Sequence, residues 1–197
     1  MADIAIIFEP GKGQLPPCDT RIEKFFSYWL SIRLSAGRLP SRQHFNPADL
    51  KNLLPYLWML DVYRNPLRLK YRLVGTEHVH AAGWDPTGKW FDEVHSSAVH
   101  SAHYSQFTEA AEHAMICFFK GQTPRRDISY FRDPVPGTSF RDPLASLTPK
   151  RHLEKIFLER LITPFAQNGI EVDRLVGISI VISYVPELDS SAAGRDG

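Results

Sequence analysis

The chain has 197 residues and a formal net charge of +1, because 23 lysine and arginine residues nearly balance 22 aspartate and glutamate residues. This balance argues against direct binding of nucleic acid and against a polybasic membrane anchor, since both require a clustered excess of positive charge. Hydrophobic residues make up 43% and charged residues 23% of the chain. These values are ordinary for globular proteins and exclude wholesale disorder, so we expect one domain with extensions.

The first nine residues have no cationic start, and their apolar run is too short for a signal peptide. The sequence has no stretch approaching the roughly 20 apolar residues of a membrane-spanning helix. Its two cysteines, Cys18 and Cys117, are too few for a disulfide framework, and reduced thiols are the simpler expectation. We therefore predict a cytoplasmic protein with no membrane partner.

A helix is predicted over residues 20–36, after a flexible leader at 10–19 that is rich in glycine and proline. Thr20 and Glu23 form a capping-box pattern at its start, and Gly37 suits the left-handed position after its end. Apolar side chains extend beyond one stripe of this helix, which indicates two surfaces to cover. We therefore predict that the helix packs on its own domain and also forms a homodimer.

The next segments predict a hairpin and short helices. Residues 46–49 carry the asparagine cap and proline that begin a short helix. An apolar run at 57–63 and an alternating run at 67–73 predict two antiparallel strands, because period two places the apolar residues on one face. Residues 77–82 suit a short helix, and 85–88 have the composition of a turn.

The longest helix is predicted over residues 98–120, because apolar residues recur there at helical spacing and Gly121 suits its end. A strand is predicted at 123–132. The proline-rich stretch 133–150 is predicted to be an irregular loop.

The last third of the chain predicts further strands. Residues 153–163 fit either a helix or a buried strand. Asn168-Gly169 favours a tight reversal, and the alternating, β-branched run 172–184 predicts a strand. The resulting order of helices and strands indicates an α+β fold with one antiparallel sheet.

Several stretches, spread in order over roughly residues 28–184, resemble a bacterial family of stand-alone single PAS domains. They are Leu39-Pro40-Ser41-Arg42, Phe45-Asn46-Pro47-Ala48-Asp49-Leu50, Leu54-Pro55, Tyr71-Arg72-Leu73-Val74-Gly75-Thr76, Asp85-Pro86-Thr87-Gly88 and Val172-Asp173-Arg174-Leu175-Val176-Gly177.

The resemblance implies a PAS-like five-stranded antiparallel sheet with helices covering one face, plus an N-terminal helical extension. It also favours a strand for the ambiguous segment 153–163. The implied organisation is a leader and helical cap at 1–55, a PAS-like domain at 56–184 and a flexible tail at 185–197.

PAS-like domains generally hold a small molecule, or nothing, between the long helix and the sheet. The resemblance therefore implies a candidate ligand pocket with aromatic and apolar walls. A filled core made of the same residues is the favoured alternative, because sequence does not distinguish a cavity from a packed interior. The candidate lining residues are Tyr71, Leu73, Trp84, Trp90, Phe91, His103, Phe107, Met115, Tyr130, Ile178 and Ile180.

Histidines gather around the predicted long helix, and we considered a haem or metal site at His100 and His103. We disfavour it, because no H-E-x-x-H or Cys-x-x-Cys pattern supports metal binding. No motif for flavin photochemistry surrounds Cys117. The cofactor is therefore left unknown, and no metal site is predicted.

The sequence has no nucleophile elbow, P-loop or Rossmann fingerprint. We therefore predict a sensory or regulatory module, not an enzyme, that binds a small ligand or a partner protein and signals through protein contact. Two alternatives stay open. One is a small α+β enzyme or ligand carrier with Tyr71, His103, Tyr130 and Ser179 as polar candidates, and the other is a ligand-free scaffold.

Overall fold

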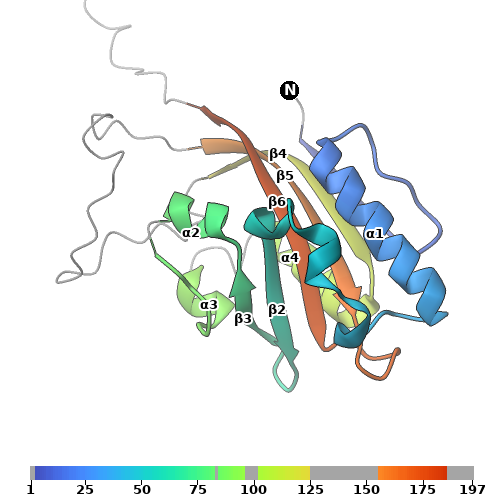
Figure 1. Cartoon of the computed structure of the whole chain (residues 1–197). Helices are drawn as coiled ribbons and strands as arrows, with labels where there is room; N and C mark the ends of the chain where they lie inside the picture. The colour runs from blue at the N-terminus through green and yellow to red at the C-terminus, as the bar shows by residue number, and fades with distance from the viewer. Residues whose placement is uncertain (1–2, 83, 96–101, 125–154, 186–197) are drawn as a thin grey trace, which may run out of the picture.

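A computed structural model describes residues 3–82, 84–95, 102–124 and 155–185. Its centre is an antiparallel sheet of six strands in the order β1-β4-β5-β6-β2-β3 (Figure 1). The predicted α+β class is confirmed. The strands are β1 (Ile4–Phe8), β2 (Leu57–Tyr63), β3 (Arg68–Val74), β4 (Ile116–Pro124), β5 (Lys155–Phe165) and β6 (Arg174–Val185).

The sheet has one strand more than the five that the sequence predicts. The additional strand is β1, which lies within the segment 1–55 predicted to be a leader and helical cap. β1 pairs with β4 along its whole length, from Ile4 opposite Lys120 to Phe8 opposite Ile116. Five apolar residues are too short a signal to separate a strand from a loop by periodicity. The strand forms because β4 offers it an open edge more than 100 residues further along the chain.

The predicted N-terminal helix is confirmed as α1 (Thr20–Ala36). Its cap is Asp19, one residue before the predicted Thr20, because the Asp19 carboxylate accepts a hydrogen bond from the backbone N–H of Arg21 at 2.8 Å. Gly37 ends the helix in the left-handed conformation with φ 65°, which glycine adopts without steric cost.

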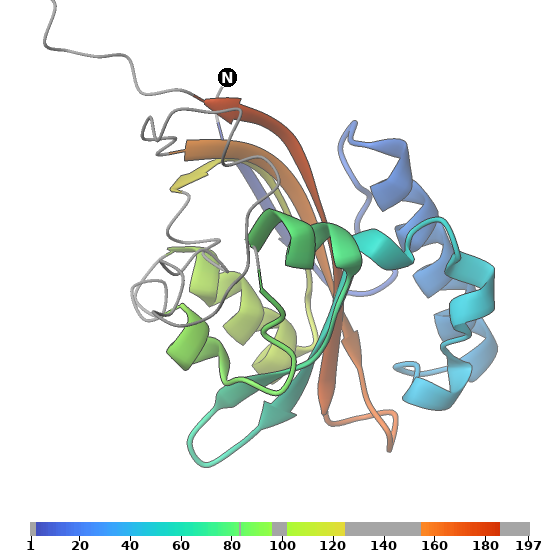
Figure 2. The ribbon, with the colours of Figure 1, turned by 60° about the vertical axis from the view of Figure 1, so that its left-hand side comes forward.

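Helices cover both faces of the sheet, whereas the sequence predicts helices on one face plus an N-terminal helical extension. The N-terminal extension is what covers the second face. Figure 2 shows α1 and the turns that follow it on one side, and α3 and α4 on the other. On the α1 side lie three short 3₁₀ turns, at Arg42–His44, Pro47–Leu50 and Leu54–Tyr56. The other helices are α2 (Thr76–Ala82), α3 (Phe91–Val94) and α4 (Ala102–His113).

Two large apolar cores result, one on each face, and Phe119, Ile156 and Leu158 form a third, small cluster. The α1-side core contains Phe8, Ile22, Phe25, Trp29, Phe45, Met59, Ile116, Phe118, Leu161, Phe165, Val176, Ile178 and Ile180, among others. The α4-side core contains Trp58, Leu60, Leu69, Tyr71, Phe91, Val94, Phe107, Ala110, Ala111, Cys117, Ile162, Val172 and Leu175. Because neighbouring strand residues point to opposite faces, β2, β4, β5 and β6 each serve both cores.

The predicted long helix over 98–120 is wrong in its second half. Helix α4 ends at His113, Ala114 has φ 55°, and β4 begins at Ile116. Residues 116–119 are buried on both faces and flanked by β1 and β5, so strand pairing outweighs a helical spacing that Phe118 fits by coincidence. Gly121 is not a helix end but lies within β4.

The remaining strand predictions are largely confirmed. Strand β2 matches the predicted range 57–63, and β3 and β6 begin or end within two residues of their predicted limits. The ambiguous segment 153–163 contributes strand β5. Residues 125–132 of the predicted strand 123–132, the loop 133–150 and nearly all of the tail 185–197 lie outside the described residues.

Candidate functional site

A buried polar pair lies in the α4-side core, formed by Tyr71 on β3 and His95 at the end of α3. The Tyr71 hydroxyl and His95 Nε2 share a hydrogen bond of 2.8 Å. Both residues are 3% exposed. The turn at 85–88 fixes the strand, because Tyr71 accepts from the N–H of Gly88 at 2.7 Å and donates to the carbonyl of Lys89 at 2.9 Å. Gly88 has φ 83°, so a side chain there would strain this turn.

The imidazole of His95 is held in its neutral form. Burial, and then the positive charge of Arg160, lower the pKa of His95 to about 3. At physiological pH the ring therefore brings hydrogen-bonding capacity to the core without a charge.

Arg160 brings a positive charge into the same layer from the middle of β5. Its guanidinium donates a hydrogen bond to Gln106 Oε1 on α4 at 3.0 Å. The guanidinium carbon also lies 4.8 Å from the ring centroid of Phe107 and 5.8 Å from that of Phe119. Stacking on aromatic rings suits a guanidinium, because it is more weakly hydrated than an ammonium group.

Trp58 on β2 closes the layer against β6. Its indole N–H donates to Ser179 Oγ at 2.9 Å, and its ring lies 5.5 Å from that of Phe107. A Cβ atom at Gly177 would collide with the Trp58 ring, so glycine is required for this close approach. The indole of Trp58 therefore lies between strand β6 and helix α4.

Aromatic rings connect these polar groups. Phe91 lies 4.9 Å from Phe107 and 5.6 Å from Tyr104, measured between ring centroids, and stacks on Tyr71 at 5.9 Å. Aromatic walls with a few convergent polar groups are typical of small-molecule sites. The same contacts also pack the layer, so the arrangement suits both the ligand-pocket and the filled-core interpretations.

Five of the predicted lining residues are brought together here. Tyr71, Phe91 and Phe107 are part of the α4-side core, and Trp84 and Met115 pack against it. Met115 stands between α4 and β4, because the helix ends earlier than predicted.

Four other predicted residues lie elsewhere. Ile178 and Ile180 belong to the α1-side core, because on β6 it is Gly177 and Ser179 that point toward Trp58. Leu73 is 44% exposed beyond a register shift between β2 and β3. Trp90 packs at the outer edge of β3, with its ring 4.1 Å from the guanidinium carbon of Arg68.

The last two predicted lining residues, Tyr130 and the side chain of His103, lie outside the described part, as does His100. Sequence reasoning did not assign Trp58, Gln106 or Arg160 to the site. Arg160 carried a usable signal, since it is a charged residue within a mostly apolar strand. No group of three histidine, cysteine, aspartate or glutamate residues suited to a metal ion occurs among the residues that the structure describes.

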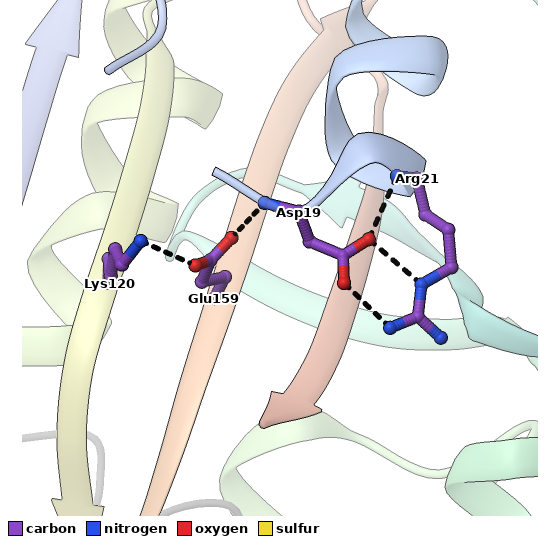
Figure 3. A network of polar contacts seen from close by, with 4 residues as sticks. All are labelled: Asp19, Arg21, Lys120 and Glu159. Carbon is purple, nitrogen blue, oxygen red and sulfur yellow. Dashed lines mark hydrogen bonds and ion pairs between the residues drawn. The ribbon is translucent and has the colours of Figure 1, made fainter. Parts of the chain in front are cut away.

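The α1 side carries a different polar arrangement, shown in Figure 3. Glu159 on β5 is 3% exposed, pairs with Lys120 Nζ on β4 at 2.8 Å and accepts the backbone N–H of Asp19 at 2.6 Å. The Asp19 carboxylate is bound in turn by the guanidinium of Arg21 at 2.7 and 2.9 Å. This charged network joins the start of α1 to two central strands.

The hydrogen bond from Arg21 keeps the pKa of Asp19 below its usual range. Burial is the main cause that raises the pKa of Cys18, beside this network, to about 11. Burial also raises the pKa of Cys117, in the α4-side core, to about 12. Both thiols are therefore protonated at neutral pH, the form in which cysteine is a poor nucleophile.

A surface groove lies between α1 and the second and third 3₁₀ turns, on the face opposite the Tyr71–His95 pair. Its charged and aromatic lining consists of Arg21, Lys24, Tyr28, Asp49, Lys51 and Tyr56.

Within the described ranges, every helix is too short or too polar to cross a membrane.

The antiparallel sheet with helices on its faces has a PAS-like fold. A sequence model described as a PAS domain matches residues 19–132, and this match begins at the Asp19 cap of α1. Because it spans more than half of the 197 residues, the chain belongs to the PAS domain family.

One similar solved structure is that of an RNA-binding Light-Oxygen-Voltage receptor, at 11% identity and a TM-score of 0.42. That alignment covers 92% of this chain and 39% of the receptor, so the chain spans about two fifths of the receptor's length. No curated protein is similar enough to count as a match.

Proposed function

We propose that the chain is a sensory PAS module that binds a small molecule in the α4-side layer and signals through α1 to a partner protein. The observation that carries this proposal is the buried Tyr71–His95 pair, placed beside the Arg160–Gln106 pair within one aromatic layer. Tyr71, His95 and Gln106 are buried, and Arg160 is partly buried. Polar groups removed from water are costly unless satisfied, so a layer needed for packing alone has little use for all four.

The chemistry of this layer favours a flat ligand that carries hydrogen-bond acceptors. The rings of Phe91, Phe107 and Trp58 offer apolar surfaces, and the guanidinium of Arg160 is a fixed donor. The imidazole of His95 is neutral, so it adds hydrogen-bonding capacity beside the guanidinium without adding a second positive charge.

A route from this layer to α1 runs through β5. Arg160 faces Gln106 and Phe107 on the α4 side, and its neighbour Glu159 faces Lys120 and Asp19 on the α1 side. A ligand that moves Arg160 therefore acts on the strand that holds the cap of α1. The proposed output is a change in how α1 is presented to a partner.

Native mass spectrometry and an absorption spectrum of the purified full chain test the ligand proposal. We expect a mass-shifted or coloured species that is lost in Phe107→Trp, because the larger ring occupies the space between Phe91 and Trp58. Phe45→Trp is the matched control, since Phe45 is a buried ring in the α1-side core. Loss of the bound species in both variants, or retention in both, contradicts a site in the α4-side layer.

A ligand-free scaffold is the second candidate, and the close ring contacts of Phe107 with Phe91 and Trp58 favour it. Such a scaffold predicts an unmodified mass and no ligand-dependent shift in melting temperature across a metabolite library. It also predicts that hydrogen exchange in α1 does not respond to any added compound.

A further inference from the structure

The two edges of the sheet differ in how they are protected. At the β3 edge, Arg68, Lys70 and Arg72 alternate along the strand. The backbone of Lys70 forms an isolated antiparallel β-bridge with Trp90. The cationic groups of Arg68 and Lys70 lie 4.1 and 5.2 Å from the centroid of the Trp90 ring. Charges and a covering segment of this kind prevent an edge strand from pairing with another chain.

Among the residues that the structure describes, the β1 edge has neither a charged side chain along the strand nor a covering segment. All five residues of Ile4–Phe8 are uncharged and apolar. Ile4 is 38% exposed and Ile7 is 42% exposed, and Ala5 is also exposed. Within the described ranges β1 pairs with β4 alone, so its outer backbone groups have no strand partner there.

β1 is nevertheless firmly held in position. Asp3 accepts a hydrogen bond from the backbone N–H of Gln122 at 2.9 Å, which fastens the start of the strand to β4. At the other end, Phe8 is 9% exposed and packs edge-on against Phe26 of α1 with ring centroids 6.0 Å apart. The free edge is therefore preformed and loses little conformational entropy when a further strand is added.

We propose that β1 pairs antiparallel with β1 of a second copy of this chain, which joins the two sheets across a two-fold axis. An antiparallel pair of identical strands is two-fold symmetric, so one strand supplies both halves of the interface. The added pair also continues the antiparallel pattern between β1 and β4. This interface differs from the α1 interface predicted from sequence and does not depend on ligand binding.

Charge selects the register of this pairing. A register centred on Ile6 places Asp3 opposite Glu9 of the other copy, and like charges directly opposite are destabilising. A register centred on Ala5 places Ile4 opposite Ile6 and Asp3 opposite Ile7, which avoids that repulsion. Apolar side chains then meet on both faces of the new pair.

Light scattering coupled to size-exclusion chromatography of the full chain, over a concentration series, tests the proposal. We expect about twice the 22.4 kDa chain mass for the wild type and a single-chain mass for Ala5→Lys, which sets two lysines directly opposite each other. Val181→Lys is the matched control, because Val181 is 37% exposed but lies on β6. Leu34→Lys, at a position on α1 that is 74% exposed, is also expected to stay dimeric.

Ile7→Glu, which sets a carboxylate opposite Asp3 of the other copy, provides a second disrupting variant in case Ala5→Lys does not fold, which circular dichroism detects. Hydrogen exchange adds a local measurement. The amides within residues 4–8 that point away from β4 are expected to be protected in the wild-type dimer and exposed in the monomeric variant, whereas those that bond to β4 stay protected in both. A wild type of single-chain mass at every concentration overturns the proposal. A dimer that survives both charged variants at β1, or that Leu34→Lys dissociates, also overturns it.

Discussion

The two faces of the sheet use polar groups in opposite ways. On the α1 side the interior is apolar, and the charged residues Glu159, Lys120 and Asp19 stand at the point where the helix begins. On the α4 side Tyr71, His95 and the other polar groups lie within the aromatic layer itself. Polarity therefore anchors an element on one face, whereas on the other it lies within the core, where we propose that it recognises a ligand.

The largest effect is expected when the apolar face is emptied. Trp29→Ala removes a side chain that is fully buried and whose indole N–H donates to the carbonyl of Pro164 at 3.3 Å. We expect the free energy of unfolding to fall by about 3–5 kcal/mol, measured by urea denaturation. Leu34→Ala on the exposed side of α1 is the control, with a change within about 0.5 kcal/mol. Equal losses in the two variants are incompatible with α1 packing on the sheet through Trp29.

The charged network comes next. Glu159→Gln removes the charge that pairs with Lys120 and weakens the hydrogen bond from Asp19, so we expect unfolding free energy to fall by about 2–3 kcal/mol. Adding Lys120→Met is expected to recover part of this loss, because the unpaired ammonium is then absent. If the double variant loses the sum of the two single losses, Glu159 and Lys120 do not interact energetically.

The α4-side layer predicts a pH dependence. Because the folded pKa of His95 is about 3 and below its unfolded value, the unfolded state binds a proton first as pH falls. The stability from neutral His95 is complete above the unfolded pKa and is lost as pH decreases toward 3, by about 1.4 kcal/mol per pH unit. Burial also lowers the pKa of His78, which acts in the same direction.

Denaturant unfolding at a series of pH values measures how the free energy of unfolding changes with pH. In His95→Gln the slope of unfolding free energy against pH, between about pH 6 and 4, is expected to decrease by the amount that corresponds to one bound proton. His113→Gln, at an exposed position on α4, is expected to keep the wild-type slope. An unchanged slope in His95→Gln would show that this imidazole is not held neutral by the fold.

The smallest effect is expected for Tyr71→Phe, which keeps the ring contacts with Phe91 and deletes only the hydroxyl that binds His95. We expect a loss of about 1 kcal/mol in unfolding free energy. If the substitution reduces the ligand-induced shift in melting temperature more than it reduces the stability of the unliganded protein, the hydroxyl acts in recognition and not only in packing. Equal effects on both favour the scaffold interpretation.

Local patterns predicted the elements whose signals lie within one segment. The helix 20–36 and the strand 57–63 follow from capping residues and apolar runs, and both match the structure. Strand β1 and the start of β4 were missed because each depends on a partner distant in sequence. A run such as residues 116–119 fits a buried strand or a helix until its neighbours are known.

The candidate site shows the same limit. Ring-bearing residues such as Phe91 and Phe107 were predictable as interior residues from their apolar character. Partners such as His95 for Tyr71, or Gln106 for Arg160, are set by how α3, α4 and β5 pack. Ile178 was assigned to the wrong face because the alternation of β6 fixes two faces but does not say which one meets α4.

The opposite charges at neighbouring positions of β5 also constrain how the chain folds. A slip of β5 by one residue would place the Glu159 carboxylate among Phe107 and Phe119 and move the Arg160 guanidinium beside Lys120. Both placements cost free energy, because a charge would be buried without a partner or set against a like charge. The dipeptide Glu159-Arg160 therefore selects one alignment of the central strand, a safeguard against misfolding that purely apolar alternation cannot supply.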